Sequence, residues 1–163
     1  MAGYGDDTAF ATWLVTYGRT LPVGSPVAAV LRQRGSAYID GTYGLRFPGT
    51  PTGGADQERA WPRTGAVDRW GNSLNASTVP ARVVEASYEA AWAEASAPGS
   101  LVASGSAAAR VKREKVEGAV EVEYQTSASS TGLVADMTPL LTAVEGLLGP
   151  LLVPSNIPYA LVV

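Results

Sequence analysis

Residues 110–125, RVKREKVEGAVEVEYQ, are the stretch that says most about how this chain folds. After Gly118, valine and tyrosine alternate with glutamate. This period of two is typical of a strand with one buried face. The basic residues before Gly118 can form a second strand, so the stretch predicts a β-hairpin.

The loop length of this hairpin decides which side chains face each other. A three-residue loop at 117–119, with Gly118 free to adopt a positive φ, places Lys115 opposite Glu121. A two-residue loop would instead place Glu114 opposite Glu121, and like charges directly across a ladder are destabilising. We therefore predict the three-residue loop.

Composition sets the broad class of the protein. The chain has 163 residues, of which 46% are hydrophobic, enough for one domain with a real core. Its formal net charge is −3, and all 12 basic residues lie within residues 1–115, whereas 116–163 hold five acids and no base. The last third is therefore a poor DNA surface and a plausible protein-contact surface.

The chain contains neither cysteine nor histidine. Disulfides, thiolate chemistry, the common zinc sites and the usual general base are thereby excluded. No glycine-rich phosphate loop or carboxylate cluster replaces them, so we predict a protein that is not an enzyme and that uses no cofactor or metal. No stretch has the length of a membrane span and no leader pattern begins the chain, which predicts a non-membrane protein made in the cytoplasm.

Apolar periodicity predicts helices over residues 6–17, 26–39, 80–96 and 138–148. Serine or threonine before proline predicts the start of the second and fourth helices. Gly35 lies inside the second helix and weakens the prediction that this helix is continuous. The predicted buried residues of the first two helices are Phe10, Trp13, Leu14, Tyr17, Val27, Val30, Leu31, Tyr38 and Ile39. In the third helix, three glutamates are predicted to face water: Glu85, Glu89 and Glu94.

Residues 41–78 are rich in Gly, Pro, Thr and Asn and predict a long loop insertion, which in a compact domain is usually functional or held by other segments. We favour the interpretation that Phe47 and Trp61 anchor it to the helices, because large aromatic rings gain most from burial. The alternative is a platform that stacks single-stranded DNA, with Trp61, Arg63 and Trp70 in contact with it.

These elements predict a mainly α fold: a small helical bundle with a long loop insertion, one β-hairpin and an extended C-terminal arm. The expected parts are a helical body at 1–109, the hairpin at 110–125, and a spacer, apolar helix and arm at 126–163. The arm ends in the uncharged run YALVV. Such a run has to be covered, either by its own domain or by another subunit.

Four segments carry a recognisable pattern: residues 38–44 (YIDGTYG), 60–63 (AWPR), the helix from Val79–Pro80, and 112–124 (KREKVEGAVEVEY). In these segments the chain resembles a family of tailed-phage proteins that is described as DnaT-like and single-stranded-DNA-binding. The chain is similar in these segments to the head-to-tail connector, or adaptor, proteins of siphophages, and the resemblance spans about residues 6–148.

The resemblance implies a structural subunit in the neck of the virion. Such subunits form a ring, a dodecamer in this family, between the portal protein and the stopper or tail-completion protein, and double-stranded DNA passes through the ring without sequence-specific contact. The expected subunit or stopper contacts are in the hairpin: Arg113, Lys115, Val120, Val122 and Tyr124. The expected portal contacts are in the arm, which the resemblance does not cover: Pro154, Ile157, Pro158, Tyr159, Leu161, Val162 and Val163. The alternative function is a DnaT-like replication accessory protein that binds single-stranded DNA.

Overall fold

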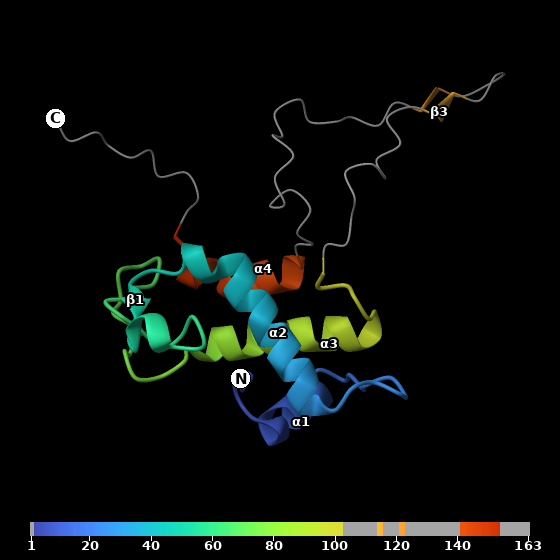
Figure 1. Cartoon of the computed structure of the whole chain (residues 1–163), viewed down its shortest axis with the longest axis horizontal. Helices are drawn as coiled ribbons and strands as arrows, with labels where there is room; N and C mark the ends of the chain where they lie inside the picture. The colour runs from blue at the N-terminus through green and yellow to red at the C-terminus, as the bar shows by residue number, and fades with distance from the viewer. Residues whose placement is uncertain (1, 103–113, 116–120, 123–140, 154–163) are drawn as a thin grey trace. The chain divides into compact units, whose positions relative to one another are not determined.

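The structure is a computed structural model that describes residues 2–102, 114–115, 121–122 and 141–153 (Figure 1). It is mainly α-helical, which confirms the predicted fold class. Its α-helices are α1 (Asp7–Thr16), α2 (Ala28–Tyr43), α3 (Ala81–Ser96) and α4 (Thr142–Leu148). Short 3-10 turns follow as η1 (Gly44–Arg46), η2 (Gly54–Asp56) and η5 (Gly149–Leu151). The chain divides into two compact units, Met1–Leu101 with Leu140–Val163, and Val102–Pro139.

Helix α1 begins as its sequence predicts. The Asp6 carboxylate caps it by accepting a hydrogen bond from the Ala9 amide at 2.8 Å. The side chains of Phe10, Trp13 and Leu14 are buried. Tyr17, predicted to join them, lies past the end of the helix and is 54% exposed, so that prediction is wrong.

Helix α2 differs from its prediction at both ends. The Ser25 hydroxyl donates to the Pro22 carbonyl at 2.7 Å and does not cap the helix, which begins at Ala28. The helix continues past Ile39 to Tyr43. Because Tyr43 is fully buried in the core, tertiary packing holds the last turn in a sequence whose local propensity is weak. Val27, predicted to be buried, is exposed.

Small residues form the crossing between α2 and α3, where Figure 1 shows one helix running over the other. Gly35 does not interrupt α2 but lies at the point of closest approach. A Cβ atom on Gly35 would lie 2.3 Å from the Ser87 carbonyl oxygen and 2.8 Å from the Ala91 amide nitrogen. Glycine is therefore required there by the packing of the two backbones.

Two of the three glutamates expected to face water in α3 are instead paired inside the body. Glu94 is 6% exposed, pairs with Arg34 at 3.1 Å and accepts a hydrogen bond from the Gly99 amide. Glu89 pairs with Arg19 at 2.6 Å. The apolar period of α3 did not reveal these partners, because the arginines come from other segments.

The core consists of two clusters of buried side chains. One lies beneath α1: Phe10, Trp13, Leu14, Leu31, Tyr88, Ala91 and Ala95. The larger one joins α2, α3, α4 and the insertion, with these among its members: Tyr4, Ile39, Tyr43, Phe47, Trp61, Val83, Val144 and Leu148. Helix α4 therefore belongs to the same body as α2 and α3, although residues 102–139 separate it from them in the chain.

Residues at the N-terminus are tied to the body by an arginine that sequence reasoning did not single out. The Arg32 guanidinium donates to the carbonyls of Gly5, Tyr4 and Gly3 at 2.8, 3.1 and 3.3 Å. It also pairs with Asp7 at 2.8 Å. A buried guanidinium with this many acceptors is well satisfied, so the segment before α1 is part of the folded body.

A polar network then joins that segment to α2 and the insertion. The Tyr4 hydroxyl donates to the Asp40 carboxylate at 2.5 Å and accepts from the Trp61 amide at 3.2 Å. Arg59 pairs with the other Asp40 oxygen at 3.3 Å. Burial raises the pKa of Tyr4 and the pKa of Asp40, and the Tyr4 hydrogen bond and Arg59 offset part of the shift at Asp40.

Two short antiparallel ladders complete the described elements. β1 (Thr50–Pro51) pairs with β2 (Arg63–Thr64) and closes the insertion on itself. β3 (Glu114–Lys115) pairs with β4 (Glu121–Val122). Lys115 lies opposite Glu121, which confirms the predicted register, and the predicted loop at 117–119 lies outside the described residues.

Candidate partner-binding surface

Trp61 lies inside the body and anchors the insertion. Its side chain is 2% exposed, and its ring meets the Phe47 ring edge-to-face at a centroid distance of 5.4 Å. Both residues belong to the larger core cluster. The favoured sequence interpretation, in which these two rings anchor the loop, is confirmed.

Arg63 is likewise used internally. It is 7% exposed, and its guanidinium donates to the carbonyls of Pro48 and Gly49 at 2.7 Å and to those of Ala60 and Phe47 at 3.2 and 3.3 Å. Burial lowers its pKa. Because these acceptors come from both sides of the insertion, Arg63 holds the loop in one shape.

The expected DNA platform of Trp61, Arg63 and Trp70 therefore does not exist as a surface in this fold. Trp61 cannot stack on a base and Arg63 cannot reach a phosphate without opening the body, so these two residue assignments are corrected. Trp70 is the exception, with 66% of its side chain exposed.

Trp70 lies at the tip of a turn with a closely bonded backbone. The Asp68 carboxylate accepts hydrogen bonds from the amides of Trp70 and Asn72 and from the Asn72 side chain, each at 2.9 Å. The Asn72 side chain is the main reason that the pKa of Asp68 is lowered. Val67 and Ser73 close the turn with an antiparallel bridge. The exposed indole is thus presented by a defined turn and not by a loose loop.

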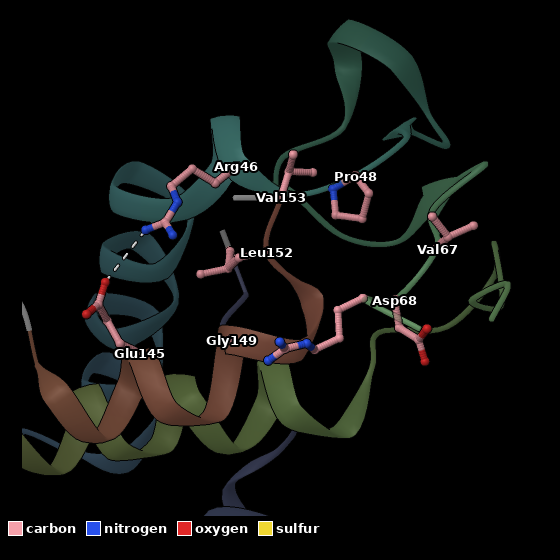
Figure 2. Close-up of a pocket in the computed structure, with 9 residues that line it drawn as sticks. Arg46, Pro48, Val67, Asp68, Glu145, Gly149, Leu152 and Val153 are labelled. Carbon is pink, nitrogen blue, oxygen red and sulfur yellow. Dashed lines mark ion pairs between the residues drawn. The ribbon is translucent and has the colours of Figure 1, made fainter. Parts of the chain in front are cut away.

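A groove lies beside this turn, where the 3-10 turn after α2 meets the end of α4 (Figure 2). Its volume is about 500 Å³. Figure 2 shows Leu152 and Val153 between Arg46 on one side and Val67 and Asp68 on the other. The full lining is Arg46, Pro48, Val67, Asp68, Arg69, Glu145, Gly149, Leu152 and Val153.

Backbone hydrogen bonds fix the last described segment in this groove. The Val153 amide donates to the Arg46 carbonyl, and the Arg69 amide donates to the Pro150 carbonyl, both at 2.9 Å. Across the groove, Arg46 pairs with Glu145 at 3.6 Å. The groove is assembled from three distant parts of the chain, so no local sequence pattern could have predicted it.

Exposed apolar side chains gather in the segments that form the groove. Leu45 is fully exposed, Val67 is 44% exposed and Val153 is 37% exposed, and Trp70 adjoins Arg69 in the lining. Several exposed apolar side chains in and next to one groove favour an interaction site. Exposed aromatic residues at such sites often carry much of the binding energy.

Charges on the body are mostly neutralised in pairs. Of the eight arginines within residues 2–102, five form ion pairs with acids, and they are Arg19, Arg32, Arg34, Arg46 and Arg59. Arg63 is bound to carbonyls. Within the part of the chain that the structure describes, Arg69 and Arg82 have no carboxylate at ion-pair distance. Two separate arginines do not make the basic track that single-stranded DNA requires.

A second, wider groove of about 940 Å³ runs between α1 and the start of α3. Thr8, Thr12 and Thr16 lie along it. The hydroxyls of Thr12 and Thr16 donate to carbonyls of their own helix at 2.9 Å, so they are not free to select a ligand. The charged residues that line this groove are Asp6 and Glu85, so it offers no cation to a phosphate.

Only some of the other predicted contact residues lie in the described part of the chain. Lys115 and Val122 lie in the paired strands β3 and β4. Arg113, Val120 and Tyr124, and the predicted portal contacts from Pro154 to Val163, lie outside the described residues. Their assignments stay predictions.

Among the described residues, no group of three or more acidic side chains could hold a metal ion. No helix in that part of the chain is long and apolar enough to cross a membrane.

The fold and the surface together define a class: a mainly α-helical protein with a partly apolar groove, an exposed tryptophan and few free cations in the described part of the chain. The chain belongs to the DnaT-like family, because the family described as "Putative DnaT-like ssDNA binding protein" matches residues 7–162. No curated protein and no solved structure gives a significant match.

Proposed function

We propose that the protein is a structural, non-enzymatic subunit of a phage head-to-tail connector, which forms a ring between the portal and the stopper in the neck of the virion. One observation carries this proposal: Trp61 and Arg63, which would have to grip DNA, are used inside the body. The exposed groove combines apolar side chains with charges that are mostly paired or hydrogen-bonded within the chain. The resemblance of residues 38–44, 60–63 and 112–124 to connector proteins supports it.

Charge pairing suits this role. Double-stranded DNA has to slide through a connector, so strong phosphate contacts along the lumen would hold it back. Five arginine–carboxylate pairs leave the body with few cations for phosphates. The groove and its apolar rim are instead suited to a protein partner, since interface cores are depleted of charge and enriched in aromatic residues.

A second candidate is the binding of single-stranded DNA. The description of the family favours it, and so does Trp70, whose exposed ring lies beside the Arg69 guanidinium at 5.8 Å. One aromatic ring with one arginine would give a weak, salt-sensitive contact.

Two measurements on the full chain separate these candidates. The first is fluorescence anisotropy of a labelled single-stranded oligonucleotide at low and physiological salt. The connector proposal predicts dissociation constants weaker than about 1 µM at physiological salt, in the range of non-specific binding or beyond it. Submicromolar binding that is lost in Trp70→Ala would overturn it in favour of the second candidate.

The second measurement is the native mass of the protein mixed with the portal protein of the same phage. We expect a ring-sized complex with portal and no ring without it, since premature closure would block assembly. Deleting residues 154–163 should leave the body folded and abolish the complex. If the truncated chain joins the portal normally, the arm is not the portal contact.

A further inference from the structure

The groove lies where the described chain meets its C-terminal segment. Val153 lines it, and residues 154–163 follow directly. The hydrogen bond from the Val153 amide to the Arg46 carbonyl fixes the direction in which the chain arrives. Whatever residues 154–163 bind, they start from this groove.

The segment and the groove match in charge. Residues 154–163, PSNIPYALVV, carry no charged side chain. In the groove, Arg46 is paired with Glu145, and the Asp68 carboxylate is occupied by hydrogen bonds from its own turn. Arg69, the remaining charged lining residue, is exposed, so its guanidinium can stay in water at the rim. An apolar segment can therefore cover Pro48, Val67 and Leu152 without burying an unpaired charge, which would be costly.

The tether makes even a weak contact effective. A short linker gives the attached segment an effective concentration of about millimolar, so a modest affinity, still measurable with a free peptide, is enough to keep the segment docked within the chain. Pro154 and Pro158 restrict the backbone and lower the entropy that docking has to overcome.

We propose that the groove is an intramolecular docking site for residues 154–163, which cover it until a protein partner binds the same segment. Ile157 and Tyr159 supply the largest side chains for the groove. Docking also explains how an uncharged apolar segment and an exposed apolar groove coexist on one unassembled chain. The docking step depends on the groove, whereas release to the portal rests on the proposed function.

The test uses the full chain and a synthetic peptide of residues 154–163 with a sulfonated fluorophore at its N-terminus. The segment of the chain is disabled in one sample by the double substitution Ile157→Asp and Tyr159→Asp. We expect the peptide to bind this variant and to bind the unaltered chain at least about tenfold more weakly, because the attached segment competes.

Matched substitutions locate the binding. Val67→Asp, made in the double variant, should abolish peptide binding because it places a carboxylate in the groove. Val23→Asp is the control, since Val23 is fully exposed and lines neither groove. It should leave binding unchanged. Circular dichroism of each variant confirms that the helices are intact.

Three outcomes would overturn the docking proposal: no binding to either chain, equal binding to both, or equal loss of binding with Val67→Asp and Val23→Asp. A dimer mass for the unaltered chain that disappears in the double variant would show exchange between copies and overturn the intramolecular form. The portal and DNA measurements do not use this peptide. Failure of docking therefore leaves the connector proposal standing, and failure of portal binding leaves docking standing.

Discussion

Trp61 and Trp70 belong to the same insertion and are surrounded by similar residues, glycine, proline and arginine, yet their environments are opposite. Trp61 is 2% exposed and Trp70 is 66% exposed. Arg63, near the first, is bonded to four carbonyls, whereas Arg69, next to the second, contacts the exposed indole. Aromatic and basic residues close together in sequence therefore do not by themselves make a nucleic-acid surface.

The largest expected effect comes from exchanging the two tryptophans for alanine. Trp61→Ala should lower the free energy of unfolding by about 4 kcal/mol, because it empties a core position beside Phe47. Trp70→Ala should change it by less than about 0.5 kcal/mol, since it removes exposed surface. Urea unfolding followed by circular dichroism measures both. Similar losses of unfolding free energy for the two variants would contradict the different burial of Trp61 and Trp70.

The arginines beside them form the next pair. Arg63→Met should destabilise by about 3 kcal/mol, because it leaves several buried carbonyls without donors. Arg69→Met should be close to neutral, since its side chain has no carboxylate partner within the described residues. Thermal unfolding of both variants checks this. If Arg63→Met unfolds at the temperature of the unaltered protein, the insertion does not depend on its internal arginine.

Two glycines of α2 also differ in their surroundings, one at the crossing with α3 and one in open space. Gly35→Ala should destabilise by about 2 kcal/mol, because the added methyl group meets the backbone of α3 at Ser87 and Ala91. Gly41→Ala should stabilise by up to about 1 kcal/mol, since nothing lies within 4 Å of the added atom and alanine is the better helix former. Chemical denaturation measures the change in the free energy of unfolding for both variants. Changes of opposite sign would support close backbone contact between α2 and α3 at Gly35, whereas changes of equal sign would contradict it.

The smallest effect concerns Asp40, which links Tyr4 to the Trp61 side of the insertion. Burial raises its pKa in the folded protein. The folded state therefore holds the proton more tightly than the unfolded state does. The stability of the unaltered protein, compared with Asp40→Asn, should fall as the pH rises from about 4 through the pKa of Asp40 in the folded protein. Denaturation midpoints between pH 4 and 7 measure the difference, and a flat or rising difference would contradict the sign.

Local patterns in the sequence predicted much of the fold. Pro80 and the 3.6 period placed α3 almost to the residue, and alternating valines with Gly118 gave the register of Lys115 opposite Glu121. Both features depend on neighbours in the chain, which a sequence displays directly. The anchoring role of Trp61 was also predictable, because a large ring in a polar loop gains most by burial.

The remainder depends on contacts between distant segments. Ser25 and Pro26 carry a helix-start signal, but the Ser25 hydroxyl finds the Pro22 carbonyl instead. Glu94 has the spacing of an exposed residue and is buried because Arg34, from another helix, neutralises it. Similarly, the groove combines Arg46, Val67 and Leu152, which only the packed body brings together.

The single exposed indole has an optical consequence. Trp13 and Trp61 are buried and Trp92 is partly buried, so Trp70 should dominate the long-wavelength edge of the protein's emission. It lies beside the groove, in a turn whose backbone is fixed by Asp68. Selective excitation at the red edge, together with quenching by acrylamide, therefore reports through Trp70 alone whether the groove beside it is covered, and no added label is needed.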